Sequence, residues 1–272
     1  MVLKSTVCVV IPVHSANPSP AELTSFRQCF KILGEHSIKV LMPTGLNLEV
    51  YEGHVNKFER VGVDPVWLSS VEHYNRLKKN ELFYDLFNAY DFVLTYELDA
   101  YVFKNELQDW CKKDFDYIGA PWFEGWHEAG SAKNLIGVGN SGFSLRKTSK
   151  STSMLKRILQ IKYIYKFCLC KNKRGNTLFT FLMSFLKGYF KITNTGLLPR
   201  LVDFNRDNED FFWCMLVGKT FSDYKIAPVS EAVQFSFEAN PALLFEQNNR
   251  QLPFGCHAWE RYDPVFWKEH IN

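Results

Sequence analysis

The sequence FVLTYELDAYVF, residues 92–103, is the stretch that decides the fold. It begins as a buried strand and then carries Glu97 and Asp99, separated by one residue. Residues two apart in a strand project to the same side, so the two carboxylates are expected to lie together where the strand emerges. The carboxyl ends of strands in open α/β sheets bind nucleotides, and carboxylates bind Mg²⁺ and Mn²⁺. A metal site is one interpretation; a pair of acids that only caps a turn is the other.

Alternating strands and helices precede this stretch. Buried strands are predicted at 7–13, 38–42 and 58–63. A helix is predicted from Pro20, with Ser19 as its N-cap and Gly34 at its end, because proline favours the first helical position. Two further helices are expected before Phe92, one capped by Ser69 or Ser70 and running through residues 74–77, the other covering 81–87. This order predicts an α/β fold with a parallel sheet and right-handed crossovers.

The chain after residue 103 is less regular. Residues 116–122 predict a short strand that stops at Pro121, and residues 232–238 predict a strand with an acid at its end. The segment GVGNSGFSLR, 137–146, has glycines where the backbone needs positive φ or a close approach. It is not a dinucleotide fingerprint, because the glycine spacing is wrong. Two acids at 209–210 precede an aromatic helix, where they serve as a base or complement the helix dipole.

Length and composition indicate one domain of 272 residues, of which 46% are hydrophobic. Residues 1–110 are expected to form a nucleotide-binding half and residues 111–272 an acceptor-binding half. The N-terminal apolar run is too short for a secretory signal. The seven cysteines are scattered, without a paired metal-binding spacing, and suggest buried thiols in a cytoplasmic protein.

A basic segment interrupts the second half at about residues 150–200. Between Arg146 and Arg200 there are 13 Lys and Arg and no Asp or Glu, which leaves 19 basic residues against all 29 acids elsewhere. Cations alternate with bulky apolar residues in this segment. Such helices adsorb to anionic membrane surfaces, and we expect that partner for residues 150–191. Plain packing on the body and nucleic-acid contact are the alternatives, the latter disfavoured because no recognition motif is present.

The ordered motifs together resemble the GT-A class of nucleotide-sugar glycosyltransferases. More closely, they are similar to an uncharacterised family, domain of unknown function 5672. The similarity runs from about Tyr74 to Trp259 and is silent on substrate. It is carried by residues 74–77, 97–103, 116–122, 139–146, 209–210 and 254–257.

The resemblance implies a GT-A-like, Rossmann-like fold, with a mixed, mostly parallel sheet flanked by helices. It implies a metal-dependent, inverting glycosyltransferase that uses a nucleoside-diphosphate sugar, UDP-sugar favoured, and a glycan or lipid-linked acceptor. Mn²⁺ or Mg²⁺ would be held by Asp99 and His257 and would relieve charge on the diphosphate, with help from Arg76 or Arg146. Asp210 or Glu209 would be the catalytic base.

The remaining expected contacts belong to the donor and the acceptor. His14 is expected near the nucleotide because the first strand borders the nucleotide crevice. Aromatic faces suit sugar stacking, and the loop at 122–127 together with the glycine loop is expected to exclude water. The donor set is His14, Tyr74, Asn75, Arg76, Glu97 and Asp99, and the acceptor set is Trp122, Trp126, Gly139, Asn140, Ser141 and Gly142.

Two departures keep other functions open. The GT-A pattern usually begins with Asp where this chain has Glu97, and the basic insertion has no counterpart in the pattern. A carbohydrate-binding protein that has lost turnover is therefore one alternative. A metal-dependent nucleotidyltransferase or phosphoesterase using the same pocket is another. The location expected for the transferase is cytoplasmic, or peripheral on the inner face of the membrane, with a role in polysaccharide synthesis.

Overall fold

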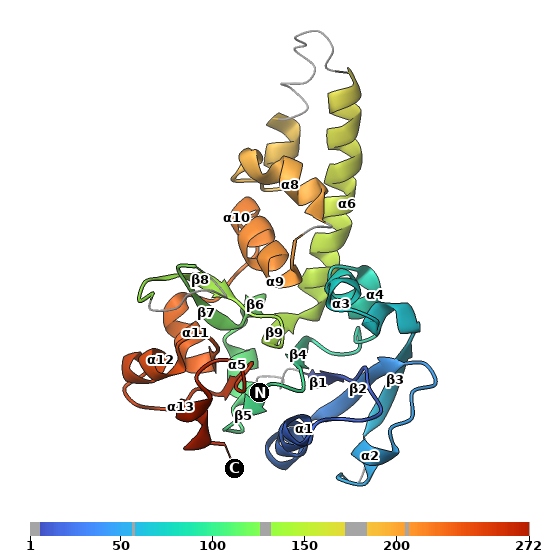
Figure 1. Ribbon diagram of the computed structural model, residues 1–272. Helices are drawn as coiled ribbons and strands as arrows, with labels where there is room; N and C mark the ends of the chain where they lie inside the picture. The colour runs from blue at the N-terminus through green and yellow to red at the C-terminus, as the bar shows by residue number, and fades with distance from the viewer. Residues whose placement is uncertain (1–5, 56–57, 126–131, 172–183, 205–206, 272) are drawn as a thin grey trace, which may run out of the picture.

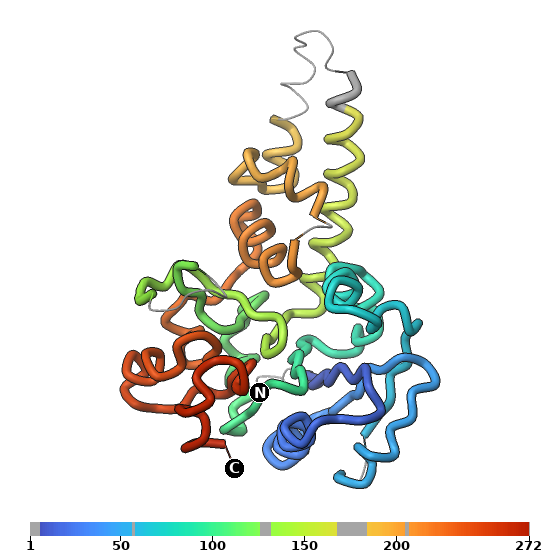
Figure 2. The backbone as a smooth tube through the Cα atoms, viewed as in Figure 1, coloured from blue at the N-terminus to red at the C-terminus, as the bar shows by residue number. Residues whose placement is uncertain are grey.

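The structure is a computed structural model that describes residues 6–55, 58–125, 132–171, 184–204 and 207–271. It consists of an α/β body and a helical arm that projects from the body (Figure 1). The arm, defined as the described residues 148–204, contains the long helix α6 (Thr148–Lys171) and the short elements η3 (Thr195–Leu197) and α8 (Leu198–Val202). Figure 2 shows the later helices of the arm running beside α6. The insertion predicted from charge is therefore mostly helical where it is described, with a non-helical stretch at residues 191–194.

The central sheet has six strands in the order β3-β2-β1-β4-β9-β6. Strands β3, β2, β1 and β4 are parallel to one another, and β9 runs antiparallel to both of its neighbours. This confirms the predicted mixed, mostly parallel α/β sheet. The strands are β1 (Val7–Pro12), β2 (Ser37–Pro43), β3 (Glu59–Val63), β4 (Phe92–Tyr96), β6 (Tyr117–Ile118) and β9 (Phe143–Lys147).

Two hydrophobic cores cover the two faces of this sheet. In β1, Cys8 and Val10 belong to the core shared with α3, α4 and α6, whereas Val9 and Ile11 belong to the core shared with α1. This alternation is the two-residue period of a strand buried on both faces. The flanking helices are α1 (Pro20–Leu33), α2 (Glu49–Glu52), η1 (Pro65–Leu68), α3 (Val71–Lys78), α4 (Glu81–Asp85) and α5 (Leu107–Lys112).

The C-terminal part of the body carries two small sheets and several short helices. One sheet has the order β10-β11-β5 and the other pairs β7 with β8. The strands are β5 (Tyr101–Val102), β7 (Ala120–Phe123), β8 (Leu135–Gly139), β10 (Ser236–Phe237) and β11 (Gly255–Cys256). The helices are α9 (Glu209–Phe211), a π-helical turn (Phe212–Val217), α10 (Gly218–Thr220), α11 (Val229–Phe235), α12 (Pro241–Gln247) and α13 (Pro264–Lys268).

The acidic stretch is not one continuous strand, which corrects the prediction for residues 92–103. Strand β4 ends at Tyr96, and the N–H of Ala100 donates to the carbonyl of Glu97 at 2.8 Å, which closes a turn. The chain then enters β5, which pairs with β11 in a different sheet. Glu97 remains tied to the central sheet because its N–H donates to the carbonyl of Gly142 at 2.7 Å. The two acids therefore project from a turn at the strand end.

Two other predicted strands are also corrected. The strand expected to stop at Pro121 is divided into β6 and β7, and β7 continues through Pro121, opposite Val138. A two-stranded sheet has free edges, so it tolerates a residue without an N–H. Residues 232–238 are mostly the end of α11, which begins after Pro228, and only Ser236 and Phe237 are extended.

The other sequence expectations concern thiols and membrane spans. Five described cysteines are free and buried, in agreement with the prediction: Cys8, Cys29, Cys111, Cys214 and Cys256. Among the residues that the structure describes, no helix combines the length and the apolar character that a membrane crossing requires.

Candidate active site

A cleft of about 640 Å³ opens at the carboxyl ends of β1 and β4. The chain leaves β1 toward β2 on one side, and β4 lies on the other side, so this is the point where the strand order reverses. Open α/β sheets bind ligands at such points. Four of the residues predicted to bind a donor line this cleft: His14, Tyr74, Glu97 and Asp99.

Glu97, Asp99 and His257 form a cluster at this cleft. Each offers one ligand atom, and these atoms all lie within 4.8 Å of one another. Nε2 of His257 lies 3.1 Å from Oδ1 of Asp99 and 3.8 Å from Oε2 of Glu97. The Asp99 side chain is 45% exposed, so the cluster can be reached from solvent. The structure thus brings Asp99 and His257 into one cluster, which is the condition that the predicted metal site requires, although about 160 residues separate them in the sequence.

The cluster fits a divalent cation. Nε2 of His257 is buried and makes no hydrogen bond of acceptable geometry with the described residues, although Asp99 is near. Nδ1 of the same ring lies 3.0 Å from Oε1 of Glu238. A carboxylate on one ring nitrogen fixes the tautomer that presents the other nitrogen to a metal. Two carboxylates and one imidazole form a donor set suited to Mn²⁺ and compatible with Mg²⁺.

Electrostatics also favour positive charge at this point. Burial by itself lowers the pKa of His257, but the carboxylates of Asp99, Glu238 and Glu97 outweigh it and raise the pKa well above its usual value. Without a metal, an imidazolium therefore supplies the cation that the carboxylates attract. A divalent ion would take over that role and leave the imidazole neutral as a ligand.

Gly142 allows His257 to reach the cluster. A Cβ at residue 142 would lie 2.0 Å from Nε2 and 2.2 Å from Cδ2 of the His257 ring. The backbone of Gly142 also accepts the hydrogen bond from Glu97, so the glycine cannot move away freely. The glycine loop is thus a place of close approach, as the sequence suggested, whereas the positive φ, 80°, falls on Asn140.

The Gly142→Ala variant should be less stable than the native chain by about 1–3 kcal/mol, the usual range for overpacking a rigid site. Urea unfolding measures the difference. The matched control is Gly188→Ala, because a Cβ at Gly188 would have nothing within 4 Å. Equal stability of the two variants would show that His257 does not occupy the space above Gly142.

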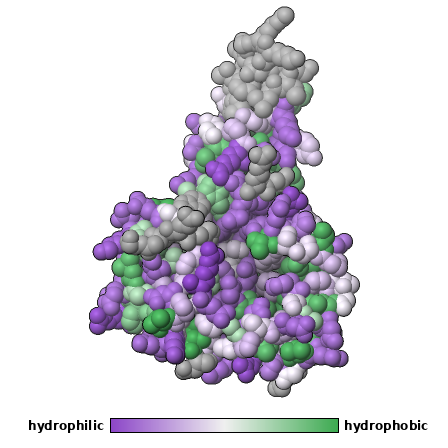
Figure 3. Space-filling view, in the orientation of Figure 1, coloured by the Kyte–Doolittle hydropathy of each residue, from purple (hydrophilic) through white to green (hydrophobic). Residues whose placement is uncertain are grey.

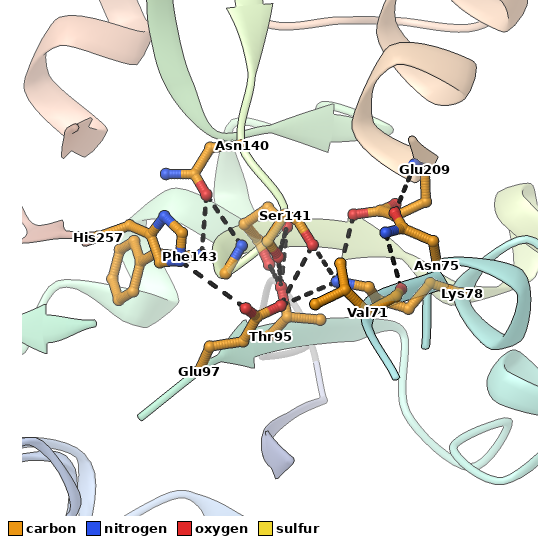
Figure 4. Close-up of polar contacts among 12 residues, drawn as sticks. Val71, Asn75, Lys78, Thr95, Glu97, Asn140, Ser141, Phe143, Glu209 and His257 are labelled. Atoms are coloured by element: carbon orange, nitrogen blue, oxygen red, sulfur yellow. Dashed lines mark hydrogen bonds and ion pairs between the residues drawn. The ribbon is translucent and has the colours of Figure 1, made fainter. Parts of the chain in front are cut away.

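A buried lysine holds Glu97 in place. Lys78, at the end of α3, is fully buried, and its Nζ donates to Oε1 of Glu97 at 2.9 Å and to Oγ of Ser141. Figure 4 shows Lys78 between Glu97 and Glu209. Burial by itself raises the pKa of Glu97, but Lys78 and His257 outweigh it and hold that pKa well below its usual value. Glu97 is therefore ionised, with one oxygen fixed by Lys78 and the other facing His257.

Glu209 and Arg146 form a fully buried ion pair. The two guanidinium nitrogens Nη1 and Nη2 lie 2.6 Å from the two carboxylate oxygens of Glu209. The N–H of Glu209 donates to Oδ1 of Asn75 at 2.8 Å. Burial raises the pKa of Glu209, but Arg146 and Lys78 outweigh it and lower that pKa. Arg146 therefore serves this pair and does not line the cleft, which corrects the expectation that it assists a diphosphate.

Asp210 differs from its neighbour Glu209. Its carboxylate is buried, and its hydrogen bond comes from the N–H of Phe211 at 2.8 Å. Burial, with further contributions from Glu209 and Glu238, raises the pKa of Asp210 from 3.8 to about 6. A carboxylate with a pKa near the working pH is well suited to accept and release a proton.

The other predicted site residues lie in different places. Asn140, Ser141 and Gly142 lie next to the cluster, where Oδ1 of Asn140 accepts from the N–H of Gly142 at 2.8 Å (Figure 4). Gly139 packs against the ring of Trp122, which is 4% exposed. Arg76 lies outside the cleft, where it pairs with Glu72 at 2.8 Å. Trp126 lies outside the described residues.

Sequence reasoning missed Lys78 and the partner of His257. Lys78 follows Tyr74 by one helical turn, and Lys78 Nζ lies 4.0 Å from the centre of the Tyr74 ring. The available signal for Lys78 was its position one turn after Tyr74, on a helix that precedes an acidic strand end. Glu238 was noted only as an acid at a strand end, and its pairing with His257 depends on the contact of β10 with β11.

Comparisons with known proteins give one family and a set of structures. A family model described as "Protein of unknown function (DUF5672)" matches residues 57–257. No curated protein matches the sequence. The chain is similar to mouse xyloside xylosyltransferase 1 in its apo form, with 9% identity, a TM-score of 0.49, and coverage of 93% of this chain and 97% of that one.

Two further glycosyltransferases are also similar in structure. The galactosyltransferase LgtC, solved with donor and acceptor sugar analogs, is 14% identical with a TM-score of 0.48, over 97% of this chain and 93% of that one. The apo glycosyltransferase GlyE of Streptococcus pneumoniae TIGR4 is 14% identical with a TM-score of 0.44. That match covers 97% of this chain and 60% of GlyE.

Proposed function

We propose that this chain, which belongs to the family described as protein of unknown function (DUF5672), is a metal-dependent glycosyltransferase. It would move a sugar from a nucleoside-diphosphate donor to an acceptor hydroxyl. The single observation that carries this proposal is the cluster of Glu97, Asp99 and His257 at a cleft on the carboxyl ends of β1 and β4. A strand-end cleft suits a nucleotide, and the cluster suits the cation that a diphosphate requires.

Asp99 and His257 are the proposed metal ligands, and Glu97 contributes through its free oxygen or through a water. When bound, Mn²⁺ or Mg²⁺ is a Lewis acid that offsets the charge developing on the departing diphosphate. Glu97 has Oε1 occupied by Lys78 and Ser141, so only Oε2 faces His257. This explains how a glutamate can stand where the GT-A pattern has aspartate: Lys78 and Ser141 restrict its longer side chain.

Asp210 is the proposed base. It accepts the proton of the acceptor hydroxyl as the oxygen attacks the anomeric carbon, and the leaving diphosphate departs on the opposite side with inversion. Glu209 is the weaker candidate for this role, because its two oxygens are held by Arg146 and its pKa is lowered. Glu209 is better placed as the residue that fixes the start of α9 and therefore positions Asp210.

The finer assignments belong to the same proposal. A UDP-sugar is the favoured donor, with His14 and Tyr74 beside the nucleotide in the cleft. A glycan or lipid-linked acceptor is favoured, with Asn140 and Ser141 among its contacts, and the protein would work peripherally at the inner face of a membrane. The amide Nδ2 of Asn140 supports this role, because it is buried without a hydrogen-bond partner among the described residues and can donate to a hydroxyl.

The test is a screen of nucleotide sugars with and without Mn²⁺, first by thermal shift and then by product analysis. A ligand that binds the native state raises the unfolding temperature as its excess over Kd increases. The expected result is metal-dependent stabilisation by one donor class and release of nucleoside diphosphate. Release of pyrophosphate would instead indicate a nucleotidyltransferase, and sugar binding without turnover a carbohydrate-binding protein.

A further inference from the structure

The arm exposes aromatic side chains that the body does not cover. On α6, Tyr163 is 74% exposed and Phe167 is 56% exposed, and Leu159 continues the same line at 40%. Residues four apart lie on one face of a helix, so these three side chains form one stripe. On the helical segment at residues 184–189, which we call the returning segment, Tyr189 is 69% exposed and stacks on Phe185 with ring centroids 5.5 Å apart.

Both sets of aromatic residues are exposed on the arm. Below them, a groove of about 640 Å³ at the base of the arm is lined by Lys156 and Gln160 of α6, by Tyr189 of the returning segment and by Asp85 of the body. Lys156 and Gln160 are exposed and flank the stripe of Leu159 and Tyr163. We call the exposed set Leu159, Tyr163, Lys166, Phe167, Phe185, Lys187 and Tyr189 the arm face. Figure 3 shows that the described part of the arm stands clear of the body, with hydrophilic and hydrophobic residues side by side.

The ion pairs of the described arm involve residues at its two ends, and at the second end Arg200 pairs with Asp207. At its base, Lys150 and Arg157 pair with Asp223, and Lys156 lies 3.7 Å from Glu81. Farther along the chain, four lysines make no ion pair with any acid that the structure describes. They are Lys162, Lys166, Lys187 and Lys191. Because residues 146–200 contain no acid at all, the outer arm has no internal source of negative charge.

We propose that the arm face docks on the surface of an anionic lipid membrane. Aromatic rings at the level of the headgroups, with lysines beside them, are the combination that holds a helix in a membrane interface. A second copy of this chain is a poorer occupant, since two arm faces would bring like charges together. Nucleic acid is disfavoured because, among the described residues of the arm face, aliphatic and aromatic side chains alternate with single lysines.

The membrane surface would place the active site next to its acceptor. The arm begins at Thr148, directly after β9, and β9 carries Arg146, which holds Glu209 beside the proposed base. Docking through the arm would therefore fix the distance between the bilayer and the cleft. Membrane docking rests on the proposed function only where the membrane is named as the source of a lipid-linked acceptor. The docking itself does not require sugar transfer.

Flotation of the full-length chain with vesicles tests the proposal. The probes are vesicles of phosphatidylcholine alone and of phosphatidylcholine with phosphatidylglycerol, at low and high salt. Binding is expected only to the anionic vesicles and is expected to weaken with salt. Each lysine near such a surface contributes about a fivefold factor in partitioning, so loss of two lysines should lower binding about 25-fold, and Lys166→Glu with Lys187→Glu, which also adds two negative charges, by more than that.

A second pair of substitutions tests the aromatic part. Tyr163→Ser with Tyr189→Ser should lower binding to anionic vesicles at high salt, where the lysines are screened. The matched controls are Lys268→Glu and Val265→Ser, which change exposed residues of α13 at the opposite end of the molecule from the arm (Figure 1). Both controls should float like the native chain.

Four outcomes would overturn the proposal. These are equal binding to neutral and anionic vesicles, no vesicle binding, a native dimer that the arm substitutions dissociate, or a preference for a nucleic-acid oligomer over anionic vesicles. Nucleotide-sugar turnover with a soluble acceptor is measured on the same variants. If the arm variants lose flotation but keep turnover, the result bears on the arm alone. If the native chain floats but shows no turnover, the result bears on the proposed function alone.

Discussion

The Asp99→Asn variant should lose Mn²⁺ binding and, with it, most sugar transfer. Asp99 is the most exposed member of the cluster and offers an anionic oxygen 3.1 Å from Nε2 of His257. An amide at the same position is neutral and also directs an NH₂ group toward the cation. Because loss of an outer-shell partner alone costs about 10- to 100-fold in metal affinity, loss of a ligand should exceed 100-fold. Isothermal titration with Mn²⁺ measures the affinity directly, without reliance on turnover.

The matched control for this variant is Glu260→Gln. Glu260 also lines the cleft but does not belong to the cluster, so its removal changes the charge of the cleft without removing a ligand. We expect it to bind Mn²⁺ within a few-fold of the native chain, since exposed charges contribute little at ordinary salt. Native Mn²⁺ affinity in Asp99→Asn, with its fold intact by thermal unfolding, would contradict the proposed metal site.

The fold was predictable wherever the signals were local. Ser19 and Glu22 form a capping box at the start of α1, Pro20 takes the first helical position and Gly34 ends the helix, all from neighbouring residues. Strand β1 follows from a continuous apolar run, and β2 from an apolar run interrupted by Lys39; such runs are typical of strands buried on both faces. Those features are sufficient to predict the parallel half of the sheet.

The end of β4 was not predictable, because it depends on partners that are distant in sequence. Residues 92–103 are apolar enough for one long strand, but the chain turns at Glu97 and pairs again with β11. Residues 232–238 have the composition of a strand, yet most of them lie in a helix that begins after Pro228. In both cases the tertiary partner, absent from the local pattern, decides the conformation.

The candidate site was predictable in its ligand atoms and not in its supporting contacts. Asp99 and His257 were expected together from the order of the motifs, and the structure places them in one cluster. The Arg146–Glu209 pair and the Lys78–Glu97 pair connect residues 63 and 19 positions apart on different elements. A sequence shows which residues carry charge but not which charges are buried opposite one another, so Arg146 was expected at the diphosphate.

The Asp210→Asn variant should lose turnover and gain stability at neutral pH. A general base contributes about 10²- to 10⁴-fold in rate, and an amide cannot accept the proton, so transfer should fall by that factor while donor binding persists. The stability effect has the opposite sign. The folded chain raises the pKa of Asp210 from 3.8 to about 6, so ionisation of this carboxylate opposes folding by roughly 3 kcal/mol.

The pH dependence distinguishes the two effects. Well below pH 3.8, Asp210 is protonated in both the folded and the unfolded chain, so Asp210→Asn should have nearly native stability. As pH rises from about 4 to 6, the unfolded chain loses the proton first, and the native free energy of unfolding therefore falls relative to that of the variant. Urea unfolding across this range should show the gap opening and then becoming constant above pH 6.

The neighbouring acid supplies a contrast with the opposite sign. Glu209→Gln removes the carboxylate that pairs with the fully buried Arg146, so it should destabilise the chain by about 3–5 kcal/mol at neutral pH.

If Asp210 is the base, kcat/KM of the native chain should rise with pH up to an apparent pKa of about 6, and the residual activity of Asp210→Asn should lack that rise. Native turnover in Asp210→Asn would instead assign proton removal to another group. If Asp210→Asn lost as much stability as is expected for Glu209→Gln, Asp210 too would be held by a buried cation.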